Sequence, residues 1–488
     1  YKALGDLQMR QSKTDEAIKA YQKYLENSTG DEKVAKTVGL YKYSKKKYQE
    51  AIPYLEMVKN GSLQDEEYLL ALGDSYYQQG NCQKTCVLFG TLRAKNTPEQ
   101  ILKKILRPLG ECYEKNGDDA KAAEAYEAYT ALPGVADADA SYLKAFLREK
   151  SDPKSAEALY LGNIKAYPND GRSFIRLGMM YAASPATYTK ATQPLNQASV
   201  LNPKDAAVLQ KLAQVWGGLK NEDRELEAYK KLLALEPQNV DANRRVGEIL
   251  IKKKQYSKAI ENLEMVQTMN PQDAEVMLML SEGYLKTGRQ DKGIELLAKA
   301  QTFKKDNPEL MLQLYNLYKE TGKLKESEDV IKQLIQLKKD NKYRSLYAED
   351  LMNQQRYDEA LAVAGEIEKS DPMNTDGLMF KGRIQGLQNK LDEAIETFKM
   401  VSFINENFAP AHYERGEIYR KQGNFDRAEA FFRKALQANP KYALAELGLA
   451  RIAKEQKKTG EYQDHLSRAK ALDPDNKEIL SETASAPK

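Results

Sequence analysis

The sequence predicts an all-α fold of repeated antiparallel helix pairs, because one pattern of two amphipathic helices recurs along the chain. The pattern is clearest at residues 409–440, which read APAHYERGEIYRKQGNFDRAEAFFRKALQANP. A turn at Gly423–Asn424 joins the two predicted helices. Pro440 ends the second helix because it lacks an N–H group and clashes with the preceding turn. No stretch shows the alternating pattern of a strand.

Small residues recur where the two helices of each pair must approach closely, as at Gly416 and Ala428. The glycine recurs as Gly5, Gly39, Gly73, Gly110, Gly178, Gly247, Gly382 and Gly416. The alanine recurs as Ala17, Ala51, Ala122, Ala156, Ala191, Ala259, Ala360, Ala394 and Ala428. The closing prolines are Pro168, Pro203, Pro237, Pro271, Pro372, Pro440 and Pro474. Agreement at three positions over many periods makes the repeat a property of the whole chain.

This pattern resembles the tetratricopeptide repeat (TPR) family, whose L-G-x-x-Y…A-x-x-x-F…P signature has a period of about 34 residues. The resemblance implies a TPR α-solenoid, a right-handed superhelix of antiparallel helix pairs, here with about fourteen repeats and from a bacterial source. The repeats are predicted to start just before Tyr1 and near residues 32, 66, 103, 137, 171, 206, 240, 274, 308, 341, 375, 409 and 443. One such unit cannot bury its own apolar face, so the units must stack.

Departures from the pattern suggest how the array is divided. Pro108 falls inside a first helix, Lys144 replaces the expected glycine, and an extra residue lies near Ser184. We therefore expect a possible hinge in the irregular repeats, with ordinary repeat drift as the alternative. The expected parts are an N-terminal array at 1–134, irregular repeats at 135–205, a C-terminal array at 206–474, and a capping segment and tail at 475–488. Tyr462, at the alanine position of the last repeat, suggests a cap that nothing packs over.

Composition and the absence of motifs argue against catalysis, nucleic-acid binding and membrane insertion. The 488 residues carry 75 basic and 71 acidic side chains, whereas a nucleic-acid interface needs a one-sided basic excess. No apolar run is long enough to span a membrane. His412 and His465 are the only histidines and lie far apart, which argues against a metal or nucleophile site. We expect no enzyme activity, no cofactor and no metal.

The three cysteines leave two readings open. Cys82 and Cys86 lie on one face of a second helix, and Cys112 lies on the next first helix. They are either buried thiols that act as small apolar side chains, or Cys86 and Cys112 form a bridge that needs an oxidising compartment.

In TPR proteins the first helix of each repeat lines a concave groove, and that resemblance identifies the candidate partner-binding positions. They are Ile175, Met179, Gln210, Gln214, Gly218, Arg244, Glu248, Leu278, Glu282 and Asn316. Gly217 and Met352 occupy further groove positions. Neither the Lys/Asn clamp for chaperone tails nor the asparagine ladder of TPR glycosyltransferases is present at these positions. Glycine inside a helix is about 1 kcal/mol less favourable than alanine, so two glycines at a groove position call for an explanation. We expect that Gly217–Gly218 leave the groove open for a partner. Glu248–Lys252 is expected to be a solvated pair within one helix.

The favoured function is a non-catalytic scaffold or adaptor that binds extended or helical segments of other proteins in the groove. One alternative is a periplasmic scaffold in a bacterial secretion, pilus or polysaccharide-export assembly. A weaker alternative is the regulatory arm of an enzyme whose catalytic domain lies outside this sequence. The chain begins at Tyr1, inside a repeat, so we expect a preceding segment and leave the compartment open between envelope and cytoplasm, the envelope slightly favoured.

Overall fold

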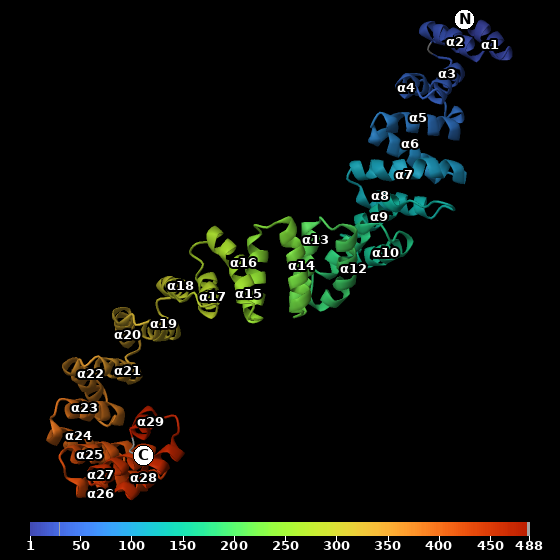
Figure 1. Cartoon of the computed structure of the whole chain (residues 1–488). Helices are drawn as coiled ribbons and strands as arrows, with labels where there is room; N and C mark the ends of the chain where they lie inside the picture. The colour runs from blue at the N-terminus through green and yellow to red at the C-terminus, as the bar shows by residue number, and fades with distance from the viewer. Residues whose placement is uncertain (29, 486–488) are drawn as a thin grey trace. The chain divides into compact units, whose positions relative to one another are not determined.

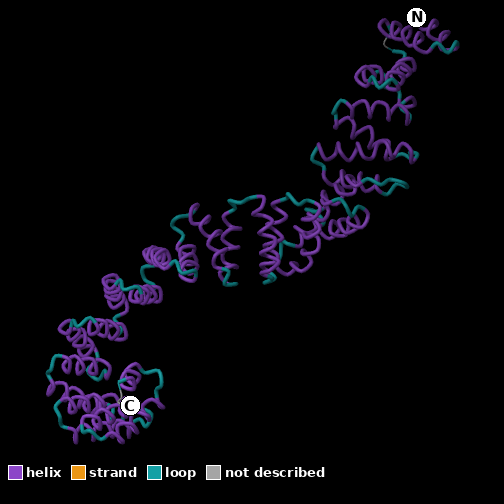
Figure 2. The backbone as a smooth tube through the Cα atoms, in the orientation of Figure 1, coloured by secondary structure: helices purple, strands orange, loops and turns teal. Residues whose placement is uncertain are grey.

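The computed structural model describes residues 1–28 and 30–485 (Figure 1). In these residues the chain forms 29 α-helices and two short 3₁₀ helices, Gly61–Leu63 and Pro185–Thr187, and no strand (Figure 2). The predicted all-α class, a TPR-type α-solenoid of tandem helix pairs, is therefore confirmed. The count of fourteen repeats stays a prediction.

The chain divides into two compact units, Tyr1–Lys254 and Gln255–Lys488, and each is described by itself. The first unit contains α1 Lys2–Arg10, α2 Thr14–Asn27, α3 Glu32–Ser44, α4 Tyr48–Glu56, α5 Glu66–Gln78, α6 Cys82–Ala94, α7 Glu99–Lys115, α8 Asp119–Thr130, α9 Ala138–Arg148, α10 Pro153–Ala166, α11 Gly171–Tyr181, α12 Tyr188–Leu201, α13 Ala206–Gly218, α14 Glu222–Leu235 and α15 Val240–Lys252. The second contains α16 Tyr256–Met269, α17 Ala274–Lys286, α18 Gln290–Phe303, α19 Pro308–Glu320, α20 Leu324–Lys338, α21 Asn341–Asn353, α22 Tyr357–Ser370, α23 Thr375–Leu387, α24 Leu391–Ile404, α25 Ala409–Lys421, α26 Phe425–Ala438, α27 Ala443–Glu455, α28 Thr459–Leu472 and α29 Lys477–Ala484.

Within each unit, an odd-numbered first helix packs on the even-numbered second helix that follows, and this second helix packs on the next first helix. First helices also contact one another directly: α3 with α5 and α5 with α7 in the first unit, and α21 with α23, α23 with α25 and α25 with α27 in the second. They therefore line a shared surface from α3 to α7 in the first unit and from α21 to α27 in the second. We call this surface the first-helix face.

The recurring glycines make room for a large side chain of the paired second helix. A Cβ atom added at Gly416 would lie 2.6 Å from the ring of Phe432, which is fully buried. The same relation holds between Gly39 and Leu55 and between Gly110 and Tyr126. All nine recurring alanines, from Ala17 to Ala428, are fully buried. The expected close approach of the two helices is thus confirmed at these three pairs, where a buried side chain fills the space beside the glycine.

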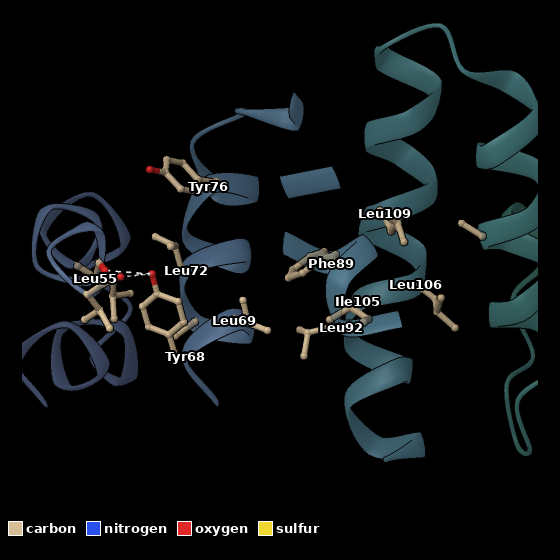
Figure 3. Close-up of a cluster of buried hydrophobic side chains, with 14 residues drawn as sticks. Leu55, Tyr68, Leu69, Leu72, Tyr76, Phe89, Leu92, Ile105, Leu106 and Leu109 are labelled. Carbon is tan, nitrogen blue, oxygen red and sulfur yellow. Dashed lines mark hydrogen bonds between the residues drawn. The ribbon is translucent and has the colours of Figure 1, made fainter. Parts of the chain in front are cut away.

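Apolar side chains from successive helices form the core of each array. In the cluster drawn in Figure 3, Tyr68 and Leu72 of α5 face α4, while Phe89 of α6 lies between α5 and α7. The Tyr68 hydroxyl donates to the carbonyl of Leu55 at 3.1 Å, so its one polar atom is satisfied inside the core. Because each helix buries side chains against both neighbours, no pair is stable by itself.

Aspartates at the starts of first helices also hold neighbouring repeats together. Asp31 caps α3 by accepting from the Val34 N–H, and the same carboxylate pairs with Lys2 of α1. Asp65 caps α5 and pairs with Lys36 of α3 at 2.5 Å. The hydrogen bond from Lys2 lowers the pKa of Asp31 below its usual range. We call this arrangement the cap clamp.

The C-terminal helix α29 covers the last helix pair. Tyr462, at the alanine position of that pair, is buried and lies in one apolar cluster with Ile479 of α29. Its hydroxyl donates to Glu482 at 3.4 Å. The expectation that nothing packs over Tyr462 was therefore wrong, whereas a short capping helix is present. The predicted Ala/Ser/Pro tail ends in residues 486–488, outside the described residues.

Candidate binding surfaces on the first helices

Every predicted partner-binding residue lies on a first helix. Ile175 and Met179 lie on α11, Gln210, Gln214 and Gly218 on α13, Arg244 and Glu248 on α15, Leu278 and Glu282 on α17, and Asn316 on α19. All of them are half-buried or exposed. The first seven belong to the first unit and the last three to the second. Their role in partner binding stays a prediction.

Side chains of the same chain fill the space left by Gly217 and Gly218. A Cβ atom at Gly217 would lie 2.8 Å from a carboxylate oxygen of Glu225, and one at Gly218 would overlap the ring of Tyr188. Both glycines are thus explained by packing within the array. The expectation that they leave the groove open was wrong.

The Glu225 carboxylate anchors an ion-pair network beside these glycines. It is buried, and Arg245 of α15 donates to it at 2.6 Å. Arg245 also pairs with Glu248 at 2.8 Å, and the hydrogen bonds that it donates to both carboxylates raise the pKa of its guanidinium. Lys252 pairs with Glu222 of α14. The expected Glu248–Lys252 pair is therefore not formed. Glu248 pairs instead with Arg245 on its own helix, and Lys252 pairs with Glu222 on α14.

A hollow opens on the first-helix face of the second unit, where α21, α23 and α25 meet. Its volume is about 210 Å³. We call it the α23 hollow, and it is lined by Met352, Gly382, Arg383, Gly386, Leu387, Leu391, Phe398, Glu414, Glu417, Ile418 and Lys421. An engineered cavity of about 150 Å³ holds benzene, so this hollow has room for one large apolar side chain.

Two glycines one turn apart in α23 have opposite surroundings in this hollow. A Cβ atom at Gly382 would lie 2.6 Å from the buried ring of Phe398, whereas one at Gly386 would meet nothing within 4 Å. The backbone of Gly386 is helical and not left-handed. Neither packing nor backbone conformation therefore explains Gly386, and its missing side chain helps to form the hollow.

Ion pairs between adjacent first helices form the rim of the hollow. Arg383 of α23 donates to Glu414 of α25 at 2.6 Å. Arg420 pairs with Glu417 at 2.9 Å and with Glu455 of α27. Burial raises the pKa of the Glu414 carboxyl, and Arg383 opposes that shift only in part. The rim is therefore charged but almost fully paired, while the wall is apolar.

The sequence reading missed this hollow except for Met352. Arg383, Gly386 and Leu387 stand at groove positions of the next repeat, as do Glu417 and Lys421 of the repeat after it. The argument applied to Gly217–Gly218, that a helix-interior glycine needs a reason, points equally to Gly386.

The three cysteines are free thiols, and the alternative Cys86–Cys112 bridge is not formed. Cys112 is fully buried, and this burial raises the pKa of its thiol. Burial raises the pKa of the Cys86 thiol to about 11.

Within residues 1–28 and 30–485, no helix is both long and apolar enough to cross a membrane.

Four family models, each described as tetratricopeptide repeat, match residues 3–28, 226–282, 348–402 and 409–442. The chain therefore contains tetratricopeptide repeats, and its tandem helix pairs are the fold that this repeat builds. Proteins of this fold bind other proteins. A comparison with curated proteins found no match.

Solved structures similar to the chain include the APC/C hetero-tetramer Cut9–Hcn1, with 14% identity and a TM-score of 0.33, over 96% of this chain and 98% of that one. The Naa15/Naa10 complex bound to HypK-THB has 16% identity and a TM-score of 0.35, and the match covers 99% of this chain and 84% of that one. PilF of Pseudomonas aeruginosa has 19% identity and a TM-score of 0.31, and the match covers 43% of this chain and 97% of that one. All three TM-scores lie below 0.5.

Proposed function

We propose that the protein is a non-catalytic scaffold that binds segments of partner proteins on its first-helix face, with the α23 hollow as one anchoring point. The single observation that carries the proposal is the open space at Gly386. Glycine in a helix costs about 0.5–1 kcal/mol relative to alanine, and no neighbour in the fold uses the space gained.

The shape and charge of the hollow match what a peptide anchor needs. Met352, Leu387 and Ile418 supply apolar contacts, and Met352 is adaptable because its unbranched side chain has several rotatable bonds. The paired Arg383 and Glu414 offer hydrogen-bonding groups to a backbone that crosses the rim. Hot spots of protein interfaces are typically such an apolar anchor in a pocket surrounded by polar contacts.

The test is to fill the hollow. Gly386→Leu places a side chain where the fold leaves space, so it should leave the urea midpoint unchanged or higher. Partners captured from the source organism by the wild-type chain should be lost. Quantitative mass spectrometry of the captured proteins provides the measurement.

Gly365 of α22 gives the matched control. It lies inside a second helix, and a Cβ atom there also meets nothing within 4 Å. Gly365→Leu should therefore keep every partner. If Gly386→Leu retains the same partners as Gly365→Leu, the hollow is not an anchoring point.

A further inference from the structure

Three consecutive second helices of the second unit each expose a large apolar side chain at their C-terminal end. Met269 of α16, Phe303 of α18 and Leu337 of α20 are 56%, 52% and 38% exposed. They stand 34 residues apart, at one position of the repeat. The next repeat has Ser370 there, which ends the row. Single exposed apolar side chains are ordinary, but this row follows one edge of the stacked helices, and we call it the α16–α20 edge.

A hollow of about 450 Å³ opens on this edge between α18 and α20. Leu337 and the buried Met311 supply its apolar part, and Gln301, Gln333 and Gln336 supply amide groups. Covering these amides with lipid chains would leave them without hydrogen bonds, at a cost of several kcal/mol. A polypeptide can satisfy them, so the hollow favours a protein occupant over a membrane.

At the C-terminal ends of α18 and α20 four lysines outnumber two carboxylates, Asp306, which lines the hollow, and Asp340, which follows Lys339. Lys304 and Lys305 follow Phe303, and Lys338 and Lys339 follow Leu337. Lys304 pairs with Glu275, but the other three lysines are exposed and have no carboxylate partner among the described residues. The helix dipole favours a cation in the last turn, which accounts for Lys338. Lys305 and Lys339 lie beyond the last helical residue, where the dipole argument is weaker.

We propose that the α16–α20 edge is a second docking surface and that its occupant is an acidic, amphipathic helix of a partner protein. The apolar face of that helix packs on Met269, Phe303 and Leu337. Its glutamates face the unpaired lysines. This surface is on the second helices and does not depend on the α23 hollow.

The test uses the full chain and a fluorescent helical peptide of about three heptads, with leucines on one face and glutamates on the flanks. The comparison peptide has lysine at each glutamate position. Anisotropy titrations should show at least about tenfold tighter binding of the acidic peptide, decreasing as salt rises. The double variant Phe303→Ser, Leu337→Ser should weaken this binding at least about tenfold, and Lys305→Glu with Lys338→Glu should abolish the preference for the acidic peptide.

The matched control is Met373→Ser with Phe403→Ser, because these side chains are 60% and 89% exposed in the same unit but lie outside the row. It should leave the affinity unchanged. Equal affinity for the two peptides, no binding of the acidic peptide, or equal loss in the control overturns the proposal. Preferential binding to phosphatidylglycerol vesicles through Phe303 and Leu337 also overturns it, in favour of a lipid surface.

Discussion

Two pairs of helix glycines, Gly217–Gly218 in α13 and Gly382–Gly386 in α23, look alike in the sequence and differ in the fold. Three of the four make room for side chains of the same chain, namely Glu225, Tyr188 and Phe398. Only beside Gly386 does the space stay open. A glycine in a first helix therefore marks either a packing contact or an open space, and the neighbouring helices decide which one it is.

The largest effect is expected at Gly382. Gly382→Ala places a methyl group against Phe398, which is only 1% exposed and cannot swing away. Overpacking of a core costs about 1–3 kcal/mol, so the free energy of unfolding should fall by that amount. Urea denaturation followed by circular dichroism measures it. An unchanged midpoint would show that α23 and α24 separate easily.

A smaller loss is expected for Gly218→Leu, at about 1–2 kcal/mol. The new side chain displaces the ring of Tyr188, which is only half-buried and can move toward solvent. The companion variant Tyr188→Ala should remove most of the penalty of Gly218→Leu in a double-mutant cycle. If the two changes are additive, Tyr188 does not fill that space.

Glu225→Gln tests the contact at Gly217 and should cost about 1 kcal/mol, because it leaves Arg245 with one carboxylate instead of two. Glu227 of the same helix is the control, since its carboxylate is half exposed and pairs with Lys231 at 3.0 Å. Glu227→Gln should change the unfolding free energy by less than about 0.5 kcal/mol. Equal losses in the two variants would contradict a special role of the buried carboxylate.

At Gly386 we expect the free energy of unfolding to rise, whereas it falls in the variants above. Gly386→Ala removes backbone freedom from the unfolded chain and meets no neighbour, so it should stabilise the unit by about 0.5–1 kcal/mol. A melting temperature below that of the wild type would mean that the space at Gly386 is filled in solution.

The smallest effect concerns pH and the rim of the α23 hollow. Burial raises the pKa of Glu414, so the folded state binds this proton more tightly than the unfolded state does. Stability should therefore decline as pH rises from the ordinary glutamate value, about 4.3, through the raised pKa. Glu414→Gln should flatten this decline in urea midpoints measured from pH 4 to pH 7. An identical slope in wild type and variant would mean that Arg383 compensates the buried charge fully.

The sequence predicted the helix pairs well because their signals are local. Predicted starts near 171, 240 and 409 agree with α11, α15 and α25, and the side chains of Asp170 and Asn239 cap the first two of these helices. The start near 103 was late, because α7 begins at Glu99, directly after Pro98. The surroundings of the glycines could not be predicted in the same way. Tyr188, for example, comes from the preceding second helix, at a position that the repeat signature does not specify.

The cap clamp couples two events that are usually separate in a repeat array. In a one-dimensional description, each repeat has its own folding term and a separate interface term with its neighbour. Asp31 contributes to both, since one carboxylate starts α3 and holds Lys2 of the preceding repeat. A repeat that detaches from its neighbour thereby also loses the start of its first helix. Because the Lys2 side chain is half exposed, this shared carboxylate is expected to add only about 0–1 kcal/mol to the coupling of the first two repeats.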